Sequence, residues 1–233
     1  LDSTNRSREH QWNYYEMHIT ARETVRGADF ILRLGGTGIV EFDLISMIPE
    51  SAVAGVFRKD LFEALKEMNP GFIRFPGGCI VEGISLENRY QWKKTVGELK
   101  DRKYIPNLWS FEDDRMKTDP DVVRPTTSHY GQSYGIGFYE YFLLCELLGA
   151  KALPVLGMGV ACQFRTTEMV DSDSPEFDAF IQDALDLIEF ANGPADSRWG
   201  SLRARMGHPR PFGLEMLAVG NEQWETQYVD LYQ

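Results

Sequence analysis

Several features that mark large classes of protein are missing from this 233-residue sequence. It holds only three cysteines, Cys79, Cys145 and Cys162, and an odd set at irregular spacing predicts neither a disulfide framework nor a zinc site. The four histidines are scattered, so we expect neither a metal nor a cofactor. No Gly-x-Gly-x-x-Gly follows a first predicted strand, which disfavours a dinucleotide-binding fold. No apolar run reaches the length of a membrane span.

Basic residues are also scarce. The 24 lysines and arginines stand against 35 acidic residues, and the net charge is -11. This argues against nucleic acid or an anionic membrane as a partner, because both attract basic surfaces. A neutral ligand such as a carbohydrate is compatible with it. The sequence shows no signal peptide and begins at Leu1 rather than at a methionine, so we expect the natural N-terminus to lie upstream.

Residues 1–57 have the pattern of β structure. Residues 15–20 alternate between apolar and polar side chains. Two apolar-rich runs, residues 30–34 and 39–45, surround a glycine-rich turn at 35–38, which is a hairpin signal. Because two or three strands do not form a stable sandwich alone, we expect residues 1–57 to be the C-terminal part of a larger β-sandwich.

From residue 58 onward, helix and strand patterns alternate. Helices are predicted at about residues 60–68, 138–148 and 175–192, and strands at 72–75, 152–158 and 216–219. Ser174 is the predicted N-cap of the third helix. The predicted buried faces are Leu61, Phe62, Leu65 and Met68; Phe138, Tyr141, Phe142, Cys145 and Leu148; and Phe177, Ile181, Ala184, Ile188 and Ala191. Such alternation is typical of a parallel sheet, and it leaves a doubly wound sheet and a barrel both open.

The run from Leu217 to Trp224 is the most informative part of the sequence. An apolar, strand-like run stops at Gly220, and an amide and a carboxyl, Asn221 and Glu222, follow it directly. The C-terminal end of a parallel strand is where barrel enzymes carry out chemistry. Apolar neighbours would favour the neutral carboxyl and hence a proton-donor role for Glu222. Taken alone, Gly220, Asn221, Glu222 and Trp224 are equally compatible with a strand end followed by a polar turn.

The segment Arg74–Cys79 is the second notable element. Arg74 comes from a predicted buried strand and needs an anionic or carbonyl partner, while Gly77 and Gly78 allow backbone amides to approach a ligand closely. By itself, this hexapeptide is better explained as a sharp turn with a structural arginine. A long polar stretch follows as far as Gly135, and we expect it to form functional loops or minor elements.

Together, these segments resemble the α-L-arabinofuranosidases of glycoside hydrolase family 51, in the branch shared by plants and gut-type bacteria. The resemblance covers the chain from about Gly38 onward. It is carried, in this order, by residues 61–83 (ending FIRFPGGCIVEG), 89–93 (RYQWK), 135–142 (GIGFYEYF), 199–209 and 218–222 (AVGNE). As an ordered set these motifs are highly specific, although each alone is weak.

The resemblance implies a fold and an activity. The fold is a (β/α)8 TIM barrel, of which residues 58–233 supply about strands two to four. It is preceded by the end of a carbohydrate-binding-like β-sandwich insert, residues 1–57. The activity is that of a retaining glycosidase, which releases terminal α-L-arabinofuranosyl residues from plant polysaccharides or oligosaccharides. In this family the nucleophile is a second glutamate at the end of strand seven, which we expect to lie outside this chain.

The resemblance also implies roles for individual residues. Glu222 would be the general acid/base. The implied substrate-binding residues are Asn221, for the sugar hydroxyl next to the reacting carbon; Gly78 and Cys79, for the sugar subsite; Trp109, as a pocket wall; and Arg74, as support from below. Many relatives carry an asparagine where this chain has Gly157-Met158-Gly159, a departure that would alter the floor of the pocket.

Two other functions stay open at this point. One is a different retaining hydrolase of the same clan, such as an endoglucanase or a xylosidase, and the other is a non-catalytic sugar-binding protein. For all three the expected partner is a carbohydrate. The substrate class implies a secreted or periplasmic location, and a homo-oligomer would be in keeping with the family.

Overall fold

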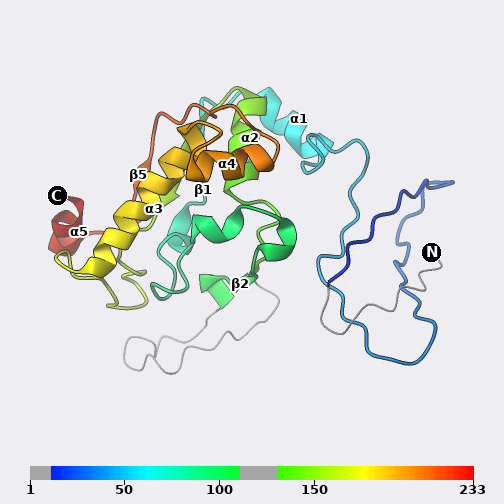
Figure 1. The fold of residues 1–233 in the computed structure, drawn as a ribbon, viewed down its shortest axis with the longest axis horizontal. Coiled ribbons are helices and arrows are strands. Elements are labelled where there is room, and N and C mark those ends of the chain that lie inside the picture. Colours follow the sequence, from blue (N-terminus) through cyan, green and yellow to red (C-terminus); the bar gives the residue numbers. More distant parts are fainter. Residues whose placement is uncertain (1–11, 111–130) are drawn as a thin grey trace. The chain divides into compact units, whose positions relative to one another are not determined.

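The computed structural model describes residues 12–110 and 131–233 of the chain. The pattern of contacts divides the chain into two compact units, Leu1–Glu41 and Phe42–Gln233. The described part of the first unit contains neither helix nor strand, and the elements drawn in Figure 1 all lie in the second.

The strands predicted between residues 15 and 45 are not formed. Residues 12–52 contain no strand, and the side chains of Phe30 and Ile39 are 58% and 95% exposed. A strand is stable only when neighbouring strands accept its hydrogen bonds and a second layer covers its apolar face. The described residues provide neither for this segment, so the prediction from alternation alone is wrong. The assignment of residues 1–57 to the end of a β-sandwich stays a prediction.

The second unit is built on a three-stranded parallel sheet of order β1-β4-β5. The strands are β1 (Phe72–Phe75), β4 (Lys151–Leu156) and β5 (Ala218–Val219). The three strands predicted in this part of the sequence are therefore confirmed, although β5 is shorter than expected. Two further strands, β2 (Ile105–Pro106) and β3 (Gly131–Gln132), form a separate antiparallel pair.

Five α-helices are described. They are α1 (Lys59–Met68), α2 (Phe138–Leu148), α3 (Pro175–Asn192), α4 (Arg198–Arg205) and α5 (Glu225–Tyr232). Between β1 and β3, the described residues up to 110 form four short 3-10 turns: Gly78–Ile80, Trp92–Thr95, Leu99–Asp101 and Leu108–Ser110. The first three helices are as predicted. The sequence was interpreted as a polar segment where α4 lies, although Ser197 is a good N-cap whose side chain accepts the Gly200 N–H. None of the described helices is long and apolar enough to cross a membrane.

The buried faces of the helices follow the prediction unevenly. All five predicted residues of α2 are buried, whereas α1 buries Phe62 and leaves Leu61, Leu65 and Met68 exposed. On α3, Ile181 and Ile188 are exposed, and Leu187 and Phe190 are buried instead. Pro175 is the first residue of α3, as predicted, but the Ser174 side chain makes no capping hydrogen bond.

The different face of α3 has an electrostatic cause. Lys93, on the 3-10 turn Trp92–Thr95, forms ion pairs with Asp183, at 2.7 Å, and with Asp186. The buried indole of Trp92 also donates to the Asp183 carbonyl at 2.9 Å. Two carboxylates therefore occupy the packed side of the helix, where hydrophobic periodicity predicts apolar residues.

An aromatic cluster forms the main core between the sheet and α2. Phe138 is fully buried, and its ring lies 5.5 Å from that of Phe75, 5.7 Å from that of Tyr90 and 6.3 Å from that of Trp92. Edge-on and tilted rings at such distances add to the stabilisation from burial. The packing ties β1 to α2, and so holds the end of β1 in place.

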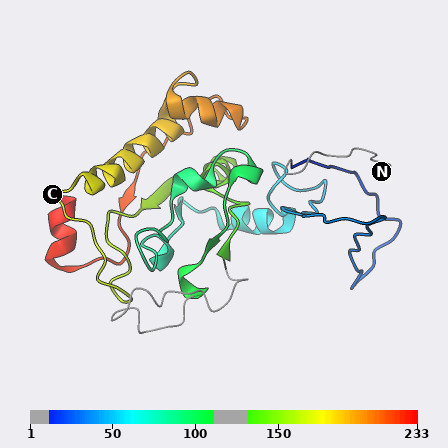
Figure 2. The same ribbon diagram turned by 60° about the horizontal axis from the view of Figure 1, so that its bottom comes forward.

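A buried arginine joins α3, α4 and the chain leading to β5. Arg203 of α4 donates to the carbonyls of Phe190 and Gly193, at the end of α3, and to those of His208 and Pro209. Figure 2 shows α3 continuing into α4 through a short turn, and α5 beside the N-terminal end of α3. These connections set the position from which the chain returns to form β5.

Candidate active site

The candidate site lies at the carboxyl edge of the parallel sheet. The three strands end at Phe75, Leu156 and Val219, and each is followed within two residues by a glycine. Because the strands are parallel, the segments after them meet at one edge of the sheet, which is where ligands bind in α/β folds. Segments far apart in the sequence therefore share one site.

The end of β5 presents an asparagine and a glutamate in an unusual backbone conformation. The Gly220 N–H donates to the Leu156 carbonyl at 2.7 Å, and Gly220 has φ +76°. A Cβ at Gly220 would collide with the Gln223 side chain and lie 3.1 Å from the Met158 sulfur, so glycine is required here. Glu222 has φ +45°, a left-handed conformation that non-glycine residues adopt at some cost and that is found often at functional sites.

Asn221 and Glu222 have different surroundings. Asn221 is buried, whereas Glu222 is exposed, and its partners are polar: the Cys79 thiol at 3.2 Å and the Asn221 amide at 3.4 Å. The expectation that apolar neighbours enclose the Glu222 carboxyl is therefore wrong for the described residues. Sequence neighbours do not enclose it because the turn after β5 directs this side chain into an open pocket.

Arg74 at the end of β1 reaches the same asparagine. Its guanidinium donates to the Asn221 Oδ1. The Asn221 Nδ2 in turn donates to both carboxylate oxygens of Glu82, each at 3.2 Å. The partner that Arg74 was expected to need is thus a side-chain carbonyl.

Cys79 contributes a neutral thiol. Burial, together with its hydrogen bond to Glu222, raises the pKa of the Cys79 thiol far above its usual value. The thiol therefore keeps its proton and donates to the Glu222 Oε2. The adjacent Gly77 has φ +83°, and a Cβ there would collide with the Arg74 guanidinium. A glycine at this position lets the chain turn tightly over the arginine.

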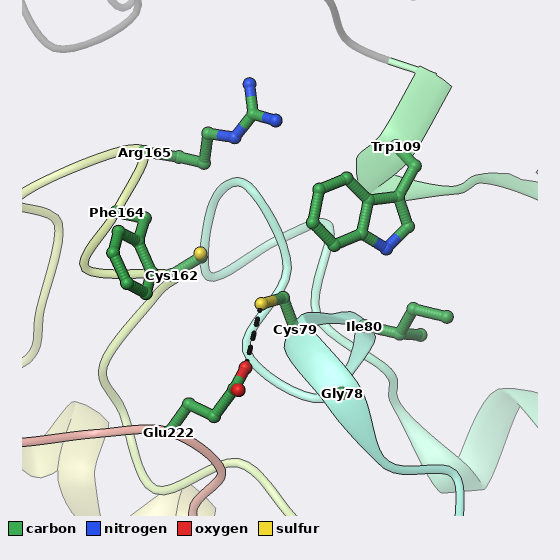
Figure 3. A pocket seen from close by; sticks show the side chains of 8 residues that line it. All are labelled: Gly78, Cys79, Ile80, Trp109, Cys162, Phe164, Arg165 and Glu222. Atoms are coloured by element: carbon green, nitrogen blue, oxygen red, sulfur yellow. Dashed lines mark hydrogen bonds between the residues drawn. The ribbon is translucent and has the colours of Figure 1, made fainter.

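Cys79 and Glu222 border a cavity of about 570 Å³, shown in Figure 3. Ligand pockets of enzymes commonly have volumes in this range. The lining residues are Gly78, Cys79, Ile80, Trp109, Cys162, Phe164, Arg165 and Glu222. Four of the six site residues expected from the sequence therefore line one pocket. The other two, Asn221 and Arg74, are linked to it through hydrogen bonds that end at Glu222.

The pocket wall combines aromatic and cationic groups. The guanidinium of Arg165 lies 5.6 Å from the centroid of the Trp109 ring, and the rings of Phe164 and Trp224 meet edge to face at 5.0 Å. Phe164 and Arg165 were not expected from the sequence. They follow β4 within a run that carries no recognisable motif, so only the fold places them here.

Glu82 is the most informative residue that sequence reasoning missed. It stands inside the quoted FIRFPGGCIVEG motif but received no role. Its side chain is almost completely buried, with 2% of the residue exposed. Burial raises the pKa of Glu82 to about 7, against the lowering effect of the hydrogen bond from its own backbone N–H, of those from Asn221 and of the charge of Arg74. A charged residue in an otherwise apolar stretch was the available signal.

One combination of donors in the site has the composition of a metal site. Ligand atoms of Cys79, Glu82 and Glu222 lie within 4.8 Å of one another. Their spacing along the chain follows no metal-binding motif, so local patterns do not predict that they meet. In the described structure these groups bond to one another: the Asn221 amide donates to both carboxylates and the Cys79 thiol donates to Glu222.

Comparisons with known proteins agree on one family. The α-L-arabinofuranosidase 1 domain model matches residues 64–233. An extracellular exo-α-L-arabinofuranosidase of Streptomyces chartreusis is 40% identical over 228 residues, which covers 91% of this chain and 25% of that protein. Alpha-L-arabinofuranosidase 2 of Arabidopsis thaliana is 36% identical over 221 residues, covering 93% of this chain and 29% of the relative.

A solved structure is similar as well. The structure of an arabinose-bound GH51 α-L-arabinofuranosidase superposes with a TM-score of 0.57 at 33% identity, covering 71% of this chain and 23% of that one. The chain spans 25% and 29% of the length of the two curated relatives described above.

Proposed function

The chain belongs to the family 51 α-L-arabinofuranosidases, and from this premise we propose that it carries the acid/base part of a glycosidase site. The reaction is the release of terminal, non-reducing α-L-arabinofuranosyl residues with retention of configuration. Glu222 is the general acid/base. The nucleophile is a second glutamate on a later strand, outside these 233 residues.

One observation carries the proposal. The carboxyl of Glu222 faces a pocket at the carboxyl edge of a parallel sheet, and its hydrogen-bond partners there are Cys79 and Asn221. Both partners can donate to a carboxylate oxygen, and they leave the rest of the carboxyl open to the pocket. A proton can therefore be exchanged with a bound ligand at that position.

The chemistry follows from two carboxyl groups on opposite sides of the glycosidic bond. In retaining enzymes these groups are about 5–5.5 Å apart. The nucleophile attacks the anomeric carbon and the bond to the departing oxygen breaks, while Glu222 gives its proton to that oxygen. Glu222 then removes a proton from the incoming water, which releases the sugar from the covalent intermediate.

The remaining residues bind and orient the sugar. Asn221 is proposed to hold the hydroxyl next to the reacting carbon, with Arg74 behind it. Gly78 and Cys79 border the sugar, and Trp109 forms a flat apolar wall of the kind that suits a sugar ring. Their grouping around one pocket supports these roles.

The same premise extends to architecture and setting. We propose that β1, β4 and β5 are strands two to four of a (β/α)8 barrel in residues 58–233, preceded by the end of a β-sandwich insert. The parallel order β1-β4-β5, with a glycine within two residues of the end of each strand, supports this. A relative named as extracellular supports a secreted or periplasmic location. The partners proposed are an arabinose-containing carbohydrate and further copies of the protein.

The test is a leaving-group series on the complete gene product. Wild type and E222Q are assayed on aryl α-L-arabinofuranosides whose phenols range from acidic to weakly acidic. General acid catalysis contributes about 10²–10⁴-fold. We expect E222Q to lose about this factor in kcat/KM on the poorest leaving groups and much less on the most acidic phenol, which needs no proton; kcat/KM is compared because it reports the steps up to departure of the phenol and not the later attack of water. E225Q is the matched control, because Glu225 is exposed and does not line the pocket.

Three results would count against the proposal. Equal losses by E222Q across the series would remove the acid role. No hydrolysis by the wild-type protein would favour the non-catalytic, sugar-binding alternative, whereas turnover of xylosides or glucans in place of arabinofuranosides would favour the other retaining hydrolases.

A further inference from the structure

Glu82 occupies a position that stability alone does not explain. It follows the 3-10 turn Gly78–Ile80, between the buried residues Val81 and Gly83, and it is itself buried. A buried carboxylate is costly unless it is paired. Within the described residues its carboxylate is hydrogen-bonded by its own backbone N–H and by one other group, the neutral Asn221 amide, and it forms no ion pair there.

The neighbours of Asn221 determine which way its amide points. Arg74 is purely a hydrogen-bond donor, and it meets the Oδ1. The Glu82 carboxylate is purely an acceptor, and it meets the Nδ2. A flipped amide would turn its NH₂ group toward the guanidinium and its oxygen toward the carboxylate, which is doubly unfavourable. The amide is therefore clamped, with its second N–H directed at Glu222.

Glu82 does not reach the reacting atoms itself. It is absent from the lining of the pocket that Glu222 faces, and its two oxygens are already used by Asn221. Its surroundings also make it sensitive to proton uptake, because burial raises the pKa of its carboxyl to about 7. A protonated Glu82 would lose one acceptor and hold the amide less firmly.

We propose that Glu82 is a positioning residue, which clamps the Asn221 amide between its carboxylate and Arg74 so that the amide is preset toward Glu222 and the bound sugar. This inference rests on the proposed function of the site. In this proposal the orientation of the Asn221 amide is set by Glu82, which lies 139 positions before Asn221 in the chain.

A double-mutant cycle in the complete gene product tests the clamp. The variants are E82Q, N221A and E82Q/N221A, with E87Q as the control, because Glu87 is an exposed glutamate of the same loop. Outer partners that orient a functional group are typically worth about 10–100-fold. We expect E82Q to lower kcat on an aryl α-L-arabinofuranoside by about this factor, with little change in KM, and E87Q to match wild type.

The decisive comparison is in the N221A background. Since Glu82 is proposed to act through Asn221, adding E82Q to N221A should lower kcat by less than about 2-fold. A purely structural role would lower activity equally in both backgrounds, together with the melting temperature. If E82Q does not fold, E82D replaces it in the cycle, because it keeps the charge but withdraws the carboxylate by one methylene.

The outcomes separate the two proposals. Losses that multiply across the cycle overturn the clamp, and so does an E82Q variant that turns over like wild type; the proposed function survives both results. No hydrolysis by the wild-type protein overturns the proposed function, and the clamp is refuted with it.

Discussion

Arg203 offers a sharp test of how the fold holds β5 in place. Its guanidinium is fully buried and donates four hydrogen bonds to backbone carbonyls, at 3.0 Å (His208), 2.6 Å (Phe190), 2.7 Å (Gly193) and 3.2 Å (Pro209). The perturbation is R203M, which keeps much of the volume and removes all four donors.

The expected cost follows from these contacts. Hydrogen bonds to a charged group contribute about 1.5–3 kcal/mol each, and an acceptor left buried and unpaired costs about 1–3 kcal/mol. Relief of the buried charge offsets several kcal/mol of this loss. Burial accordingly lowers the pKa of Arg203. Because four carbonyls lose their donor while the cost of the buried charge is relieved, we expect R203M to lose about 3–5 kcal/mol net.

Thermal melting of the complete gene product measures this cost. For domains of this size, each kcal/mol lowers the melting temperature by about 2–4 °C, so R203M should melt about 6–20 °C lower. R205M is the matched control, because Arg205 lies on the same helix, is exposed and makes one hydrogen bond, to Ser201. If both variants melt within about 2 °C of wild type, the four carbonyl contacts do not stabilise the fold as argued.

Two further predictions concern the site. The folded-state pKa of Glu82, about 7, lies above its ordinary value of 4.5, so the folded protein binds more protons than the unfolded chain between these values. The contribution of Glu82 to stability is therefore fully present below pH 4.5 and lost as the pH rises toward 7. Unfolding at several pH values should show this slope in wild type and less of it in E82Q; identical slopes would contradict it. G220A should lose activity and stability because of its positive φ and the crowding of its Cβ position. G71A, at an unstrained and open glycine, should match wild type in both assays, and equal effects of the two would refute the argument.

The sequence predicted well where a local pattern coincides with a face that the fold covers. The spacing of five apolar residues from Phe138 to Leu148 identified α2 and its buried face, because that stripe packs into the aromatic core. The strands β1 and β4 were recognised because each is a short apolar run next to turn residues. The apolar run ending in Gly220 also predicted that Asn221 and Glu222 follow a strand, and they follow β5.

Prediction failed where partners distant in sequence decide the outcome. Residues 15–20 alternate and residues 30–34 and 39–45 are apolar-rich, as strands are, but none of them forms a strand, because a strand needs neighbours for its hydrogen bonds. The packed face of α3 was misassigned because Lys93 attracts Asp183 and Asp186 to it. The position of Glu222 at an open pocket rather than among apolar neighbours depends on a turn whose geometry the sequence does not reveal.

The sequence by itself determined the family motifs, the α/β alternation and the presence of an amide–carboxyl pair at the end of a strand. Only the tertiary structure decided what surrounds that pair. The parallel order β1-β4-β5 brings the ends of three strands to one edge of the sheet, and so sets Arg74, Glu82 and Cys79 against residues more than a hundred positions away. Chemistry at the site depends on those contacts. No local pattern encodes them, because they form only when the three strands pair into one sheet.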